Sequence, residues 1–134
     1  MMTEQQLQTA HIKVKTAADF SKYIEDIMGL GMMRCEYIVK DGVVIYFDEY
    51  RYRVKSEPMY EPLIIADRSS EARLRNAIAL YKERKIDFPA FCHHAAEAGV
   101  ENWVIDTQRM RCIYYDQAGA RMAIEPIQQL NFAS

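Results

Sequence analysis

Two segments of the chain place apolar side chains at the spacing of an amphipathic helix, i, i+3, i+4 and i+7. The apolar positions are Phe20, Tyr23, Ile24 and Ile27 in the first segment and Phe88, Phe91, Cys92 and Ala95 in the second. An aspartate precedes each helix, Asp19 or Asp87, and we expect its carboxylate to accept hydrogen bonds from first-turn N–H groups. Gly31 and Gly99 follow the helices, where glycine readily adopts the left-handed conformation that ends a helix. The pattern therefore predicts two similar short helices.

Stretches rich in β-branched and aromatic residues follow each of these helices, as is typical of strands. Three strands are predicted at residues 33–39, 43–48 and 50–55, and three more at 102–107, 111–116 and 121–125. Asp41 and Gly42 form a strong hairpin signal between the first two strands. Further helices are predicted at residues 69–85 and, from a weaker pattern, at 4–15. The order of elements predicts an α+β fold with additional helices packed on the sheets.

The chain also resembles itself. A shift of 68 positions lays residues 19–59 over residues 87–127 without a gap, and nine of the 41 paired positions are identical. Because the helix and the three strands fall at matching places, we interpret the match as an internal duplication of a helix followed by a three-stranded antiparallel unit. The connector at residues 56–62 is too short to separate independent domains. We therefore expect one domain, residues 1–134, whose halves share a core around an approximate two-fold axis.

Charge and composition narrow the possible functions. The chain has 17 basic and 19 acidic residues, a formal net charge of −2, which disfavours broad binding to duplex DNA. No apolar run approaches the roughly 20 residues that a membrane-spanning helix needs, and the first 15 residues are polar. Three cysteines, an odd number, argue against a disulfide framework. We expect a cytoplasmic protein that does not contact a membrane.

The second half carries a family resemblance. It rests on Phe88, Pro89, Ala90, Phe91 and Cys92, on Ala98, Gly99 and Val100, and on Trp103, Asp106, Tyr114, Tyr115 and Glu125. In these residues the chain resembles the YdfO-like family of small enterobacterial and prophage proteins of unknown function, some of them labelled phage envelope protein. The resemblance implies an α+β fold and an origin in a mobile element, and it implies no established activity.

The residues that usually carry chemistry have structural explanations in this chain. Cys92, His93 and His94 resemble part of a metal site. The repeat aligns Cys92 with the apolar Ile24 and the two histidines with acidic residues, which places Cys92 on the core face of the helix and both histidines on the solvent face. The repeat pairs every cysteine with an apolar residue, which predicts buried and unreactive thiols. Asp48 and Asp116 occupy equivalent positions in the two halves, which favours a structural role for these carboxylates in turns. We therefore assign no catalytic residue, no metal ligand and no cofactor.

A basic stripe remains the best binding candidate. Along residues 50–55, Arg51, Arg53 and Lys55 alternate with apolar or aromatic neighbours, so the basic side chains share one face of the predicted strand. Arg121 is the repeat equivalent of Arg53. Arginines beside tyrosines on a sheet can hold phosphate, carboxylate or unstacked bases. The alternative explanation is a solvated outer face whose charges protect an edge strand.

Three functions remain open on these grounds. The first is a non-enzymatic accessory protein of a mobile element that binds a protein partner and self-associates as a homodimer across a two-fold. The second is a module for small anions or single-stranded nucleic acid that uses Arg51, Arg53, Lys55 and Arg121. The third is a hydrolase or transferase with a site between the two halves.

Overall fold

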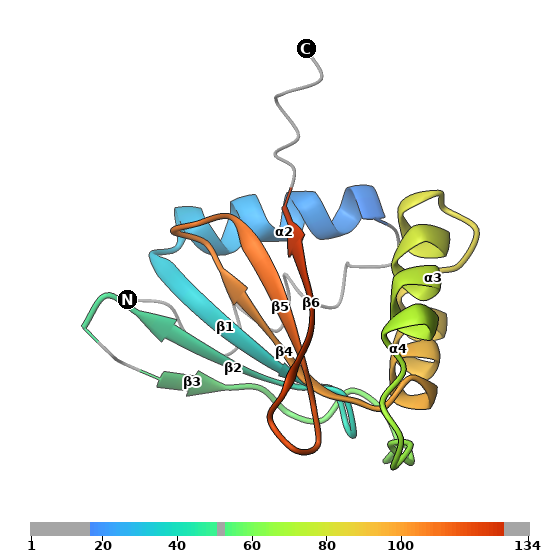
Figure 1. Cartoon of the computed structure of the whole chain (residues 1–134). Coiled ribbons are helices and arrows are strands. Elements are labelled where there is room, and N and C mark those ends of the chain that lie inside the picture. Colours follow the sequence, from blue (N-terminus) through green and yellow to red (C-terminus); the bar gives the residue numbers. More distant parts are fainter. Residues whose placement is uncertain (1–16, 51–52, 128–134) are drawn as a thin grey trace.

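The computed structural model describes residues 17–50 and 53–127 (Figure 1). Its elements are α2 (Ala17–Gly29), β1 (Met32–Ile38), β2 (Val43–Asp48), β3 (Arg53–Lys55), α3 (Glu71–Lys82), α4 (Phe88–Glu97), β4 (Val100–Asp106), β5 (Arg111–Asp116) and β6 (Arg121–Pro126). The α+β class predicted from the sequence is thereby confirmed. The helix predicted at residues 4–15 lies outside the described residues.

All six described strands form one antiparallel sheet in the order β3-β2-β1-β4-β5-β6. Each half of the chain contributes three consecutive strands, and the first strand of each half, β1 or β4, lies at the centre. The halves are therefore joined by a direct β1–β4 pairing, in which Tyr37 lies opposite Trp103.

The strand pairing repeats with the same offset as the sequence. Every β1–β2 pair, such as Cys35 with Tyr46, becomes a β4–β5 pair when 68 is added to both numbers, including the bulge near the start of each central strand. Glu36 and Val104 differ by 68 and pair with each other, so an approximate two-fold axis of the register passes through them. The register departs from this symmetry in β6, which has a bulge between the partners of Tyr114 and Tyr115. Duplication of an ancestral unit stays a prediction.

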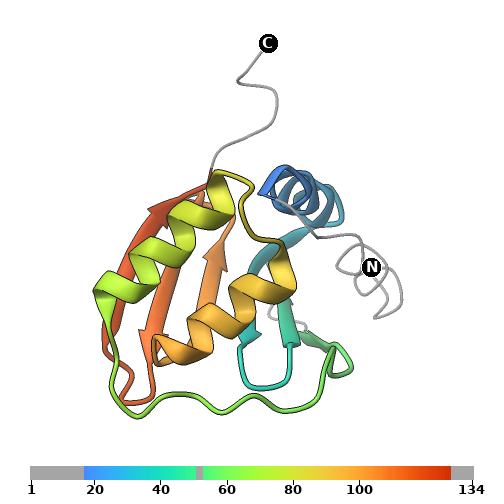
Figure 2. The ribbon, with the colours of Figure 1, turned by 90° about the vertical axis from the view of Figure 1, so that its right-hand side faces the viewer.

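The three described helices lie on one face of the sheet, as Figures 1 and 2 show from two sides. The core fills the space between helices and sheet. At its centre, the rings of Tyr37 and Trp103 stack with centroids 4.4 Å apart and planes 5° from parallel. Phe91 of α4 packs on the same indole at 5.5 Å. This stack joins the two halves because Tyr37 comes from β1 and Trp103 from β4.

The helix ends follow local chemistry, with two corrections to the sequence analysis. As predicted, Asp87 caps α4, because its Oδ1 accepts a hydrogen bond from the N–H of Ala90 at 2.9 Å. The equivalent prediction for Asp19 is wrong, since α2 already begins at Ala17 and Asp19 lies inside its first turn. The prediction of a helix to residue 85 is also too long. Helix α3 ends at Lys82, and Arg84 has a left-handed backbone with φ of 60°.

The strand predicted at residues 50–55 does not begin at Tyr50, which lies in the turn after β2. The described part of β3 covers Arg53–Lys55. Its inward residue, Val54, is 7% exposed, whereas Arg53 and Lys55 on either side are exposed. The predicted alternation of this stripe is therefore confirmed for its described part.

Candidate functional site: the uncovered face of the sheet

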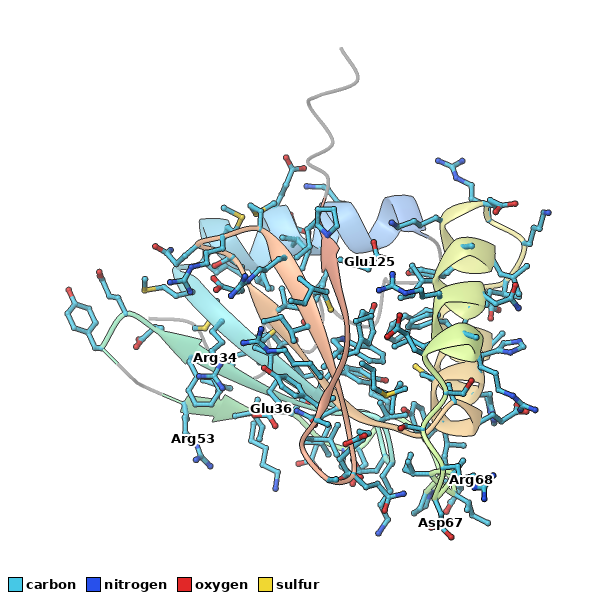
Figure 3. All side chains as sticks on the ribbon, in the orientation of Figure 1. Arg34, Glu36, Arg53, Asp67, Arg68 and Glu125 are labelled. Atoms are coloured by element: carbon cyan, nitrogen blue, oxygen red, sulfur yellow. The ribbon has the colours of Figure 1, made fainter. Side chains whose placement is uncertain are left out.

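One face of the sheet carries no helix in the described part of the chain (Figure 1). We call it the open face. Strand residues alternate between the two faces, and core residues such as Tyr37, Tyr46 and Trp103 occupy the helix side. The residues between them therefore point to the open face. Figure 3 shows Arg34, Glu36 and Arg53 on this side, away from the helices.

The pairing register arranges the side chains of the open face in three rows that run across the strands. The first, which we call the basic row, contains Arg53, Phe47, Arg34, Asp106 and Arg111. The second, the central row, contains Lys55, Ile45, Glu36, Val104, Ile113 and Ile124. The third row contains Val43, Ile38, Asn102, Tyr115 and Arg121. At these positions five basic residues face only two acidic ones, in a chain whose net charge is −2.

The arginines of the basic row form no ion pair with any residue that the structure describes. Arg34 lies over the ring of Phe47, with its guanidinium carbon 5.2 Å from the centroid. Asp106 stands between Arg34 and Arg111 in the register, but its carboxylate is bonded within its own turn, to the N–H groups of Gln108 at 2.9 Å and Arg109 at 3.1 Å. Its second oxygen accepts from Nη1 of Arg109 at 3.3 Å. The arginines of the basic row therefore carry positive charge that can attract a negatively charged ligand.

Arg111 has an unusual donor. Its Nε is shielded from solvent and has no hydrogen-bond partner among the described residues, although the residue as a whole is only partly buried. A shielded donor without an acceptor is destabilising by about 1–3 kcal/mol, and by more when the group is charged. Such atoms are rare in folded proteins and call for an explanation.

The central row is mostly aliphatic. Ile113 is 6% exposed, yet it is not part of the core cluster on the helix side. Ile124 at the β6 edge is 41% exposed, and Ile45 and Val104 are intermediate. Glu36, the acidic residue of this row, accepts a hydrogen bond from Nδ2 of Asn102 at 3.1 Å. The open face thus has an apolar strip beside its arginines.

The four binding residues predicted from the sequence do not lie together. Arg53 and Lys55 are neighbours on the open face of β3. Arg121 lies on β6 at the opposite edge of the sheet, five strand spacings away, which is roughly 24 Å at about 4.8 Å per strand. Arg51 lies outside the described residues.

Two arginines of the basic row, Arg34 and Arg111, were not among the predicted binding residues. Arg34 precedes the buried Cys35 on β1, as Arg53 precedes the buried Val54 on β3, so its orientation was open to prediction. The β1–β4 register that aligns Arg34 with Asp106 and Arg111 has no signal in a single sequence. Pairing between distant strands, rather than the stripe itself, is therefore what assembles this site.

The candidate cysteine and histidine residues separate as the repeat alignment predicts. Cys92 is buried, with Sγ 3.4 Å from the hydroxyl of Tyr37, whereas His93 and His94 are exposed. No three potential metal ligands gather within the described ranges 17–50 and 53–127. Burial raises the pKa of Cys92 to about 11 and that of Cys112 to about 12. These thiols are therefore protonated, and weakly nucleophilic, near neutral pH.

These features define an α+β chain with one helix-covered and one open sheet face. The chain belongs to a protein family of unknown function, DUF1398, whose family model matches residues 8–126. A search of curated proteins finds no match for it. Among the described residues, every helix is too short or too polar to cross a bilayer.

Proposed function

We propose that this chain is a non-enzymatic accessory protein that binds a partner protein through its open face. The proposal includes the narrower assignment to YdfO-like proteins of prophage origin, which rests on the sequence resemblance alone. The observation that carries the proposal is the aliphatic central row, bordered by arginines that have no ion pair with a described residue. Protein interfaces commonly combine an apolar centre with a polar rim, and arginine is enriched in them.

The alternative, single-stranded nucleic acid, fits the open face less well. Proteins that bind single strands present aromatic rings on which bases stack. On the two central strands the open-face residues are Arg34, Glu36 and Ile38 on β1 and Asn102, Val104 and Asp106 on β4. None of these is aromatic, so the two central strands offer a base no ring on which to stack. The ring of Phe47 is already covered on one side by Arg34.

A catalytic site between the halves finds no support in the described contacts. The junction is the β1–β4 pair, and on its helix side the stacked rings of Tyr37 and Trp103 occupy the space. Both residues are 2% exposed. A substrate could reach this position only if that stack opened.

Two exposed isoleucines allow a matched test of the binding surface. Ile124 lies on the open face and is 41% exposed, whereas Ile64 lies in the segment between β3 and α3, residues 56–70, and is 91% exposed. The full chain and the variants Ile124→Asp and Ile64→Asp would be used as bait in lysate of the source cells. We expect a partner that is retained by the parent protein and by Ile64→Asp and lost with Ile124→Asp. Equal retention by all three would refute binding through the open face.

A further inference from the structure

We propose that the partner presents an acidic segment whose carboxylates bind Arg34 and Arg111, the two arginines on either side of Asp106. This inference rests on the proposed function and adds the chemistry of the partner. It assigns a role to the basic row, which an apolar contact alone leaves unused.

The first argument is the state of Arg111. A carboxylate that binds an arginine side-on takes bonds from Nε and one Nη together. The Nε of Arg111 has no acceptor in the described chain. A rotation of the partly buried side chain that turns this edge outward would let a partner's carboxylate supply the missing acceptor. Binding would then remove an unfavourable feature of the free protein.

The second argument is the orientation of Arg34. Its guanidinium is held over Phe47, 5.2 Å from the ring centroid, an arrangement that is worth about 0.5–1 kcal/mol at an exposed site. The contact restricts the side chain without using its hydrogen bonds, and Arg34 has no ion pair with a described residue. Less entropy is therefore lost when a carboxylate binds.

The third argument is that the excess of basic residues on the open face favours an acidic partner over a second copy of this chain. The open face has five basic and two acidic residues in its three rows. Two copies packed through this face would bring like charges together, which disfavours a second copy as the occupant. An acidic segment with apolar side chains complements both the basic row and the neighbouring aliphatic row. Asp106, bonded within its turn, separates the two arginines and prevents a single carboxylate from sitting midway.

The spacing of the row sets the spacing of the partner's charges. Arg34 and Arg111 are two strand spacings apart, and so are Arg53 and Arg34, which is roughly 10 Å in each case. In an extended peptide of polyproline II conformation, which rises about 3.1 Å per residue with three residues per turn, residues i and i+3 share a face and span nearly the same distance. We therefore expect acidic residues at about every third position of an extended segment.

The test is an NMR titration of the full ¹⁵N-labelled chain with a nine-residue peptide that repeats Glu-Leu-Ser three times. A peptide with Gln in place of Glu and a 12-nucleotide oligothymidylate serve as comparison probes. We expect the acidic peptide to shift the amides of the open face and to bind at least tenfold more tightly than the Gln peptide. Arg34→Gln and Arg111→Gln should each weaken its binding roughly ten- to hundredfold, as loss of a charged hydrogen-bonded contact does. Arg73→Gln, at an exposed position on α3, is the matched control and should change binding less than twofold.

The variants need a check that they remain folded. Thermal unfolding of each variant serves this purpose, and Arg34→Lys keeps the charge while it removes the side-on geometry, so it should bind at an intermediate level. Equal binding of the Glu and Gln peptides, or no binding of the Glu peptide at millimolar concentration, would overturn the acidic anchor. If the partner is lost with Ile124→Asp but retained by Arg34→Gln and Arg111→Gln, the inference fails and the proposed function stands. Tighter binding of the oligothymidylate than of the acidic peptide would overturn both.

Discussion

Gly31 and Gly99 provide a matched pair for testing how the β3–α3 connector, residues 56–70, is held against the second half. They are equivalent in the repeat, each follows a helix, and their φ angles are nearly equal, +89° and +87°. A Cβ at Gly31 would meet no atom within 4 Å, whereas a Cβ at Gly99 would lie 2.8 Å from both the carbonyl oxygen of Arg68 and the Cα of Ser69. The change to alanine therefore adds the same backbone strain at both sites and a clash at only one.

The expected sizes follow from these contacts. A left-handed conformation is unfavourable by roughly 1–2 kcal/mol for alanine, and the reduced entropy of the unfolded chain returns about 0.4–1 kcal/mol. Gly31→Ala should therefore lower the free energy of unfolding by about 1 kcal/mol. In Gly99→Ala the connector must also move, which adds about 1–3 kcal/mol of packing strain. That movement strains the hydrogen bond from the N–H of Ser70 to the carbonyl of Ala98, 2.8 Å long.

Urea unfolding followed by circular dichroism measures both variants. Gly29→Ala is the control, because Gly29 ends α2 with nothing within 4 Å and has no positive φ. It should be neutral or stabilising by up to about 1 kcal/mol. Equal losses in Gly31→Ala and Gly99→Ala would show that the connector does not pack on Gly99 and would refute the reasoning.

Three further changes test the core and the helix ends. Burial raises the pKa of Cys92 to about 11 and that of Cys112 to about 12, whereas both thiols have a pKa near 8.5 in the unfolded chain. Above pH 9 the unfolded chain loses these protons first, so we expect the free energy of unfolding to fall by about 1.4 kcal/mol per pH unit for each thiol. A flat stability profile from pH 8 to 11 would contradict this. Trp103→Ala removes the ring stacked on Tyr37 and should lower stability by about 3–5 kcal/mol, read from urea unfolding; a loss below 1 kcal/mol would contradict the central position of the stack. Asp87→Ala should lower the melting temperature through a loss of about 1 kcal/mol, while Asp87→Asn, which keeps the cap acceptor, should stay near the parent value.

The sequence predicted the elements well because they depend on local periodicity. The strands predicted at residues 43–48 and 111–116 are confirmed with their bounds, and so is the cap at Asp87. The start of α2 was misplaced because the sequence alone does not distinguish a cap from an aspartate in the first turn, and Asp19 occupies the latter position. Local patterns therefore predict which elements form better than they predict where each one begins.

The candidate site was predicted only in part, because it depends on contacts between distant strands. The alternation around Arg53 and Lys55 placed them correctly on one face. Arg121 was grouped with them because the repeat makes it equivalent to Arg53, and equivalence under a two-fold axis places a residue at the opposite edge rather than nearby. In a sheet with this register, residues 68 apart are close only near the axis, where Glu36 pairs with Val104.

Residues related by the approximate two-fold axis are similar on the helix side of the sheet and different in charge on the open face. This difference supports the open face as the binding surface. On the helix side, equivalent positions remain apolar or aromatic, as in Tyr46 and Tyr114, Val44 and Cys112, and Cys35 and Trp103. On the open face, equivalent positions change in charge, as in Arg34 and Asn102, Ile38 and Asp106, and Val43 and Arg111. Packing against helices constrains the first set, because a buried unpaired charge is highly unfavourable. No such constraint acts on the second set, and three of the five basic residues of the open face lie together in the basic row. A ligand that contacts one row of the sheet accounts for that gathering, whereas a purely solvated face does not require it.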